Sequence, residues 1–163
     1  ITQDNFLFSS TLKENISLFR DEYDDEEIKE STKKAIVYED IKKMPKGIET
    51  VIGERGGDLS GGQKQRVSIS RAFLKESRIL IFDDTFSALS EKLIENIKEL
   101  SSEKTCIIIS NKVSDVKYSD KIIVLDKGNI VEEGTHEQLI QNEGIYSGFY
   151  NQQSTKAEPS FLV

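Results

Sequence analysis

The stretch that most constrains this sequence reads Leu59-Ser60-Gly61-Gly62-Gln63 and leads straight into a helical pattern over residues 63–75. Serine is a residue type that caps helices, and a capped first turn leaves backbone N–H groups without partners inside the helix. The glycines let an anion approach these groups because no Cβ stands in the way. The helix dipole adds positive potential at the same place. Two glycines before a helix can be an ordinary turn, but this helix start also suits a phosphate group.

A second stretch, which follows the first in the sequence, predicts a buried strand that ends in two carboxylates. Residues 79–82 are four apolar residues in a row, which predicts a strand buried on both faces of a parallel sheet. Asp83 and Asp84 close this strand at its C-terminal end, where α/β sheets place their chemistry.

Together the two stretches resemble the ATP-binding cassette (ABC) proteins. Leu59–Gln63 is similar to the family's signature motif, and Ile79–Asp84 is similar to its Walker B strand. The resemblance implies an α/β P-loop NTPase (RecA-like) fold, in which helices flank a mostly parallel sheet. It implies a helical subdomain and signature helix over about 4–75, core sheet and helices over 76–153, and a flexible tail over 154–163.

The resemblance covers the latter part of a cassette. A Gly-x4-Gly-Lys-Ser/Thr loop, which cradles phosphates, does not occur in the sequence. In the family this Walker A portion precedes the region seen here, so the fold is expected to lack it. The chain begins at Ile1 rather than Met, which suggests a fragment.

Capping and periodicity predict the remaining elements. A short helix is expected after Thr11, and a glycine turn at Lys127-Gly128 is expected to join two strands into a hairpin. The other predicted helices cover Asp24–Tyr38, Glu91–Leu100, Glu137–Gln141 and Ile145–Gln153, and the other predicted strands cover Thr105–Ile109, Asp120–Leu125 and Asn129–Glu133.

Composition excludes some classes of protein. The net charge of −7, from 22 basic and 29 acidic residues, argues against a nucleic-acid binder, which usually carries a basic face. Cys106 is the only cysteine, so no internal disulfide can form, and its apolar neighbours predict a buried side chain. The single histidine, His136, is expected at the surface. No apolar run approaches the length of a membrane span.

The resemblance also assigns two contact loops. Residues 1–8 are similar to the family's Q-loop, with Gln3 as the glutamine that reaches the Mg²⁺ and the attacking water. The stretch before the signature resembles the X-loop of exporter-type ABC transporters, which faces the transmembrane domain. Its residues are Thr50, Val51, Gly53, Glu54 and Arg55.

The chemistry expected at the site is that of ATP and Mg²⁺. Asp83 is expected to hold Mg²⁺ through water, and Ser60, Gly61, Gly62 and Gln63 are expected to bind the nucleotide.

Three positions depart from the family pattern. Asp84 stands where a catalytic glutamate is usual, and its carboxylate is withdrawn by about 1.5 Å, the length of one C–C bond. Asn111 replaces the switch histidine and cannot titrate near neutral pH. Ser90 closes the D-loop, another expected nucleotide contact, where Asp is common.

These departures suggest the degenerate half of a heterodimeric ABC exporter of multidrug, peptide or lipid type. Its intact signature would complete the site of a second nucleotide-binding domain at the cytoplasmic face of the cell membrane, while the fragment by itself would be inactive. One alternative is a fully competent ATPase half. Another is a soluble ABC protein acting on DNA or ribosomes, which the acidic balance disfavours.

Overall fold

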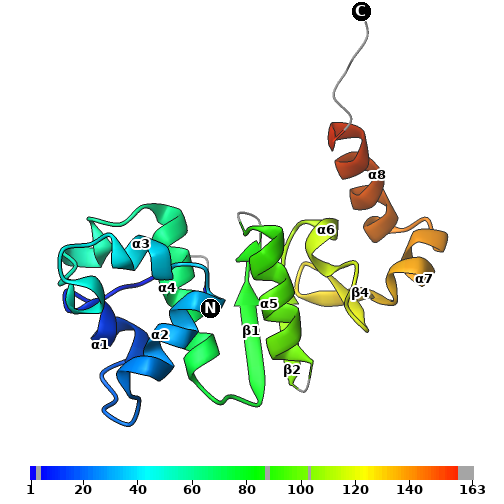
Figure 1. Ribbon diagram of the computed structural model, residues 1–163. Coiled ribbons are helices and arrows are strands. Elements are labelled where there is room, and N and C mark those ends of the chain that lie inside the picture. Colours follow the sequence, from blue (N-terminus) through cyan, green and yellow to red (C-terminus); the bar gives the residue numbers. More distant parts are fainter. Residues whose placement is uncertain (3–4, 87–88, 103, 158–163) are drawn as a thin grey trace, which may run out of the picture. The chain divides into compact units, whose positions relative to one another are not determined.

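The structure is a computed structural model that describes residues 1–2, 5–86, 89–102 and 104–157 (Figure 1). It divides into two compact units, residues 1–107 and 108–163, and each is described by itself below. No helix within the described ranges is long and apolar enough to cross a membrane.

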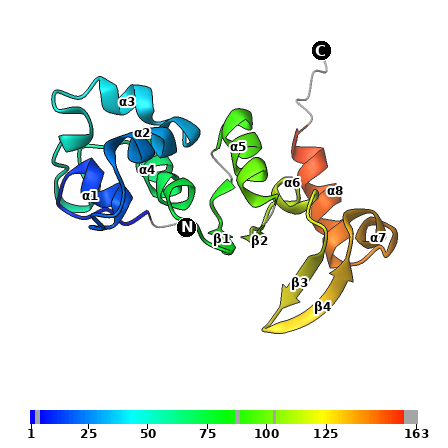
Figure 2. The ribbon, with the colours of Figure 1, turned by 60° about the horizontal axis from the view of Figure 1, so that its bottom comes forward.

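Helices dominate the first part of unit one (Figures 1 and 2). Capping boxes at Thr11, Asp24 and Ser60 start three of them, as Ser, Thr and Asp oxygens accept from first-turn N–H groups. Helix α4 packs against α1 and α2 around buried aliphatic side chains such as Ile16, Ile28 and Val67. The elements are α1 (Leu12–Ser17), α2 (Asp25–Lys34), α3 (Tyr38–Lys42), the 3-10 turns η1 (Gly47–Glu49) and η2 (Glu54–Gly56), and α4 (Gly61–Leu74).

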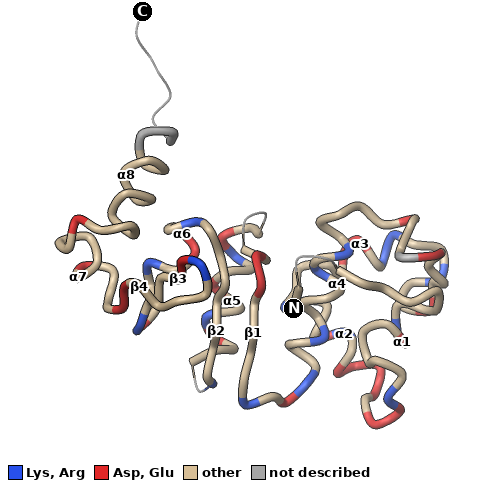
Figure 3. Tube along the Cα trace, turned by 180° about the vertical axis from the view of Figure 1, so that it is seen from behind, with Lys and Arg blue, Asp and Glu red and all other residues tan. Residues whose placement is uncertain are grey.

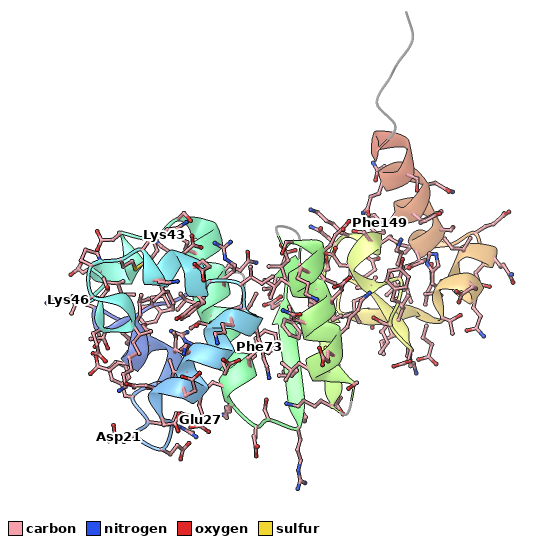
Figure 4. All side chains as sticks on the ribbon, viewed as in Figure 1. Asp21, Glu27, Lys43, Lys46, Phe73 and Phe149 are labelled. Carbon is pink, nitrogen blue, oxygen red and sulfur yellow. The ribbon has the colours of Figure 1, made fainter. Side chains whose placement is uncertain are left out.

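A dense run of acidic residues leads into α2. Figure 3 shows them as a red run between α1 and α2, and Figure 4 places Asp21 and Glu27 at the outer edge of the unit. Both are exposed, and the acidic first turn of α2 complements the helix dipole.

A strand–helix–strand segment follows: β1 (Ile79–Asp83), α5 (Glu91–Ser101) and β2 (Thr105–Ile109). The two strands are neighbours in a small parallel sheet. The prediction that β1 is buried on both faces is wrong. Leu80 and Phe82 are buried, but Ile79 is 58% and Ile81 49% exposed, because successive side chains of a strand point to opposite faces and one face lies open in this chain. Cys106 is half-buried rather than buried.

Unit two contains α6 (Val113–Val116), β3 (Ile122–Asp126), β4 (Asn129–Gly134), α7 (His136–Gln141) and α8 (Ile145–Ala157). The predicted hairpin is confirmed: β3 and β4 pair antiparallel, with a register shift after Val124. Its turn uses positive φ angles at Lys127 and Gly128. The core of the unit is formed by Val113, Ile122, Leu139 and Tyr146.

Three boundaries or environments differ from the sequence prediction. Helix α2 ends at Lys34 instead of Tyr38, because Ile36 takes a φ of 56° and Val37 N–H turns back to the Thr32 carbonyl. Helix α8 continues to Ala157, past the predicted end at Gln153. His136 is half-buried, with Nδ1 2.8 Å from the Tyr146 hydroxyl. Residues 158–163 of the predicted tail lie outside the described residues.

Candidate functional site

The start of α4 has the geometry that the sequence predicts. The Ser60 hydroxyl accepts from Gln63 N–H at 3.3 Å, and the Gln63 side-chain oxygen accepts from Ser60 N–H at 2.9 Å. This reciprocal pair fixes the first turn in place and satisfies two of the N–H groups at the helix start.

The two glycines leave that turn open. Among the described residues, no hydrogen-bond acceptor lies on the N–H groups of Gly61 and Gly62. A Cβ built at Gly61 would meet nothing within 4 Å, and one at Gly62 would lie 3.3 Å from Nη1 of Arg66. Arg66 is held at that point by an ion pair of 2.7 Å with Asp40. Free amides, a helix dipole and a nearby guanidinium together suit an anion.

A hydrogen bond that the sequence does not reveal ties α4 to the end of β1. Gln65 Nε2 donates to the Thr85 carbonyl at 2.5 Å, and the buried Thr85 hydroxyl donates to the Asp83 carbonyl at 3.0 Å. The two residues are far apart in the chain and match no local motif, so sequence reasoning missed them. The pair fixes the backbone directly after the two aspartates relative to the signature helix.

Asp83 ends β1 and Asp84 follows it, and both are half-buried. Asp83 N–H donates to the Ile1 carbonyl at 2.9 Å, so the start of the chain lies beside the C-terminal end of β1. Asp84 has a φ of 46°, a conformation that Asp and Asn tolerate better than most residues. Gln3 lies outside the described residues.

A pocket of about 550 Å³ brings Gly62 and Ser90 together. It lies beside the N-terminal turns of α4 and α5, and its apolar wall includes Ile36, Leu89 and Leu93. The Ser90 hydroxyl accepts from Leu93 N–H at 3.4 Å, so Ser90 is the N-cap of α5, a role that the sequence analysis did not assign.

Asn111 follows β2 and belongs to unit two. Its side chain is exposed and has no hydrogen-bond partner among the described residues. Its carbonyl accepts from Gln153 Nε2 at 2.8 Å, and Gln153 Oε1 also accepts from Val113 N–H at 2.9 Å. The C-terminal helix therefore holds the backbone around Asn111.

The predicted X-loop residues lie against the start of α1. Leu12 N–H donates to the Thr50 carbonyl and Ile52 N–H to the Ser10 carbonyl, both at 3.0 Å, and Thr11 and Val51 form an antiparallel bridge. Val51 is 62% exposed. Gly53 N–H donates to Asp58 at 3.1 Å, and Glu54 begins η2. The Arg55 side chain is not described.

An exposed group of aromatic residues lies in the same helical part, and we call it the aromatic cluster: Phe6, Phe8 and Phe19. The ring centroids of Phe6 and Phe8 are 4.9 Å apart and those of Phe8 and Phe19 5.2 Å apart, both in edge-to-face geometry. The φ angles of Leu18 and Phe19 are 54° and 59°. Positive φ at large apolar residues is uncommon and is concentrated at functional sites.

The groups that the site offers as ligands fit ATP together with Mg²⁺. The part of the chain that the structure describes holds no group of three or more His, Cys, Asp or Glu side chains that could bind a metal ion by itself. Mg²⁺ keeps several waters and shares its coordination with phosphates, so Asp83 suits such a shared site as one carboxylate ligand. The open turn at Gly61 and Gly62 suits phosphate oxygens.

The chain is similar to known proteins in both sequence and structure. A sequence profile of the family described as ABC transporter matches residues 1–87. The chain is 46% identical over 158 residues to the "Putative multidrug export ATP-binding/permease protein" of Staphylococcus aureus strain NCTC 8325, and equally to that of strain COL. The alignments cover 94% of this chain and 27% of those proteins. A solved bacterial Atm1-family ABC exporter with ATP bound has a TM-score of 0.86 at 35% identity, covering 99% of this chain and 28% of that one.

The structural match defines the class of protein. The chain has the fold of an ABC exporter nucleotide-binding domain, of which it spans a part. The chain belongs to the ABC transporter family. It spans about a quarter of the length of the curated relatives it matches.

Proposed function

We propose that this chain is part of the ATP-binding domain of an ABC exporter and helps to couple ATP binding and hydrolysis to transport across a membrane. The observation that carries the proposal is the start of α4, where a capped turn leaves the N–H groups of Gly61 and Gly62 without an acceptor among the described residues. An N-terminus of this kind binds the terminal phosphates of a nucleotide.

In this proposal the signature of the chain serves the nucleotide of a second nucleotide-binding domain. Ser60 and Gln63 keep the turn in shape by capping each other, and the amides of Gly61 and Gly62 bind the γ-phosphate. Ser90 lines the same pocket as Gly62 and contributes to the same contact.

The chain's own site is proposed to turn over slowly or not at all. Asp83 would hold the water shell of Mg²⁺, Gln3 would belong to the same ligand set, and Asp84 would orient the attacking water. With both groups bound, ATP would supply the reactive phosphate and Mg²⁺ would neutralise its charge. Asn111 can donate a hydrogen bond to the γ-phosphate but cannot exchange a proton near neutral pH as a histidine does. These residues favour binding over hydrolysis.

The transmembrane partner is proposed to dock on the Q-loop and X-loop side of unit one. The exposed aromatic cluster and Val51 offer apolar contact area there, and the backbone pairing between Ser10–Leu12 and Thr50–Ile52 joins the X-loop to the segment that follows the Q-loop. The whole protein would therefore work at the cytoplasmic face of the cell membrane. By itself, the chain is proposed to bind ATP weakly and to hydrolyse none.

A reconstituted heterodimer tests the assignment of the signature. We expect Gly62→Ala to reduce the ATPase rate roughly tenfold or more, because an added Cβ displaces the phosphate from the amides and a 1 Å shift is costly. Unfolding is not the cause, because alanine in a helix is more stable than glycine by about 0.5–1 kcal/mol. Gly148→Ala is the control: it makes the same change inside helix α8, where a Cβ meets nothing within 4 Å.

Asp84→Ala separates the degenerate half from its main alternative. In the degenerate half this change leaves most of the ATPase activity intact, because the partner's site does the hydrolysis. A loss as large as that of Gly62→Ala would contradict the proposal and favour a competent ATPase half. Hydrolysis in a single turnover with the partner's site disabled measures the same difference directly.

A soluble ABC protein acting on DNA or ribosomes is the remaining alternative. The net charge of −7 counts against nucleic acid as a partner, and so does the exposed acidic run before α2. Tight binding of the full-length protein to DNA or to ribosomes would favour this reading over the exporter.

A further inference from the structure

Arg71, in the last turn of α4, is half-buried and forms no ion pair with a carboxylate among the described residues. Its guanidinium donates from Nε to the Asn15 carbonyl at 2.8 Å, from Nη1 to the Phe6 carbonyl at 3.0 Å, and from Nη2 to Asn15 Oδ1 at 3.4 Å. No Asp or Glu among the described residues lies within ion-pair distance of it, and burial lowers the pKa of Arg71 from its usual value. An unpaired cation is costly to bury, so its three carbonyl contacts compensate for lost water.

Asn15 extends this contact to the loop that carries the aromatic cluster. Its Oδ1 accepts from Phe8 N–H at 2.8 Å, and its Nδ2 donates to the Phe8 carbonyl at 3.0 Å and to the Thr11 carbonyl at 2.9 Å. Asn15 is fully buried. The Asn15 side chain therefore binds both the N–H and the carbonyl of Phe8. Its Oδ1, which accepts from Phe8 N–H, also accepts from Arg71 Nη2.

We infer that Arg71 is a positioning residue that couples the signature turn of α4 to the aromatic cluster. The inference rests on the proposed function, in which nucleotide binds at one end of α4 and the transmembrane partner docks on the cluster. The helix is rigid between its first turn and Arg71, so a movement of the first turn also moves the guanidinium. The guanidinium contacts Phe6 directly and contacts Phe8 through Asn15, and the movement reaches the aromatic cluster by these two routes. A lysine keeps the charge but lacks the planar fork that reaches acceptors in different directions.

Hydrogen exchange read by mass spectrometry tests this on the full-length transporter with its partner subunit. Mg²⁺ and a non-hydrolysable ATP analogue are the probe. In the unchanged protein we expect the analogue to change exchange both at residues 60–66 and at residues 6–8. In Arg71→Lys we expect the change at 60–66 to remain and the change at 6–8 to shrink roughly fivefold or more, the lower range of allosteric coupling.

Two further variants control the experiment. Lys75→Met removes an exposed basic side chain from the same end of α4, and both responses should survive it. Asn15→Ala should reduce the response at 6–8 as Arg71→Lys does, and the double variant should show no further loss, because both residues act through one set of contacts.

The outcomes separate this inference from the function on which it rests. If Arg71→Lys keeps both responses, or loses both together, Arg71 does not couple the two places. The inference also fails if the unchanged protein responds at 60–66 but not at 6–8, and the proposed function then stands. If the unchanged protein shows no response at 60–66, the signature assignment itself fails and the inference fails with it.

Discussion

Asp84 combines a short side chain with a backbone conformation that favours it. Its φ of 46° lies in the left-handed region, where Asp is several times more frequent than most residues. In the proposed function, the same shortness withdraws the carboxylate from the attacking water. Position 84 would then suit a well-formed turn better than efficient hydrolysis.

Lengthening this side chain should raise hydrolysis at the chain's own site. We expect Asp84→Glu to speed single-turnover hydrolysis on the order of tenfold, because a 1 Å error in position costs about a hundredfold and Asn111 still limits the site. The measurement uses the heterodimer with the partner's site disabled. Asp83→Glu is the control and should slow the reaction, since it moves the metal ligand. A slower Asp84→Glu would instead mean that Asp84 is already well placed.

Several residues of the site were within reach of sequence reasoning, and others were not. The serine and glutamine of the signature form the capping box that their spacing permits. The positive φ angles of Leu18, Phe19 and Ile36 could not be predicted, because glycine or asparagine is the usual sign of that conformation. The bond between Gln65 and Thr85 depends on tertiary packing and leaves no local pattern.

Among the elements, α1 depends on an ionised side chain at its start. Glu14 accepts hydrogen bonds from the Ser10 hydroxyl and from Thr11 N–H and hydroxyl, and these bonds lower the pKa of Glu14 below that of an ordinary glutamate. A lowered folded-state pKa gives stability that is present above the unfolded pKa and is lost as pH falls through the folded pKa. The capping box of α1 is therefore sensitive to acid.

Glu14→Gln should remove this dependence. At about pH 7 we expect the variant to melt at a lower temperature than the unchanged protein, and at about pH 3 we expect the gap to close. Calorimetry at both pH values provides the measurement. Glu76→Gln, a change at an exposed residue between α4 and β1, should leave no such pH-dependent gap. A gap that persists unchanged at low pH would show that the charge of Glu14 does not stabilise α1.

The elements also show where periodicity succeeds and where it fails. Caps and turns are local, so the starts of α1, α4 and α7 and the β3–β4 hairpin were predicted correctly. Burial of β1 is not local. Its four apolar residues are typical of a strand covered on both faces, but what covers each face depends on other segments. In this chain Leu80 and Phe82 are covered, and Ile79 and Ile81 are not.

At the scale of the whole molecule, the open face of β1 and the length of the relatives point the same way. The chain spans 27% of its S. aureus relatives, and its sheet has two strands where the family resemblance implies a larger sheet. Exposed aliphatic side chains on a parallel strand are unusual, since such sheets are covered on both faces. We therefore expect further residues of the full-length protein to cover Ile79 and Ile81.

A substitution on that face should have different effects in the full-length protein and in residues 1–163 alone. In the full-length protein, Ile81→Ser should destabilise the domain by roughly 2 kcal/mol, because it removes most of a buried aliphatic side chain. In residues 1–163 alone it should leave stability nearly unchanged and reduce self-association, because the side chain is 49% exposed there. Thermal unfolding and light scattering on both proteins measure the two effects.

Ile123→Ser, at a position 49% exposed in β3, gives the corresponding comparison for unit two. Equal stability of the full-length protein with and without Ile81→Ser would show that this face of β1 stays in water there as well.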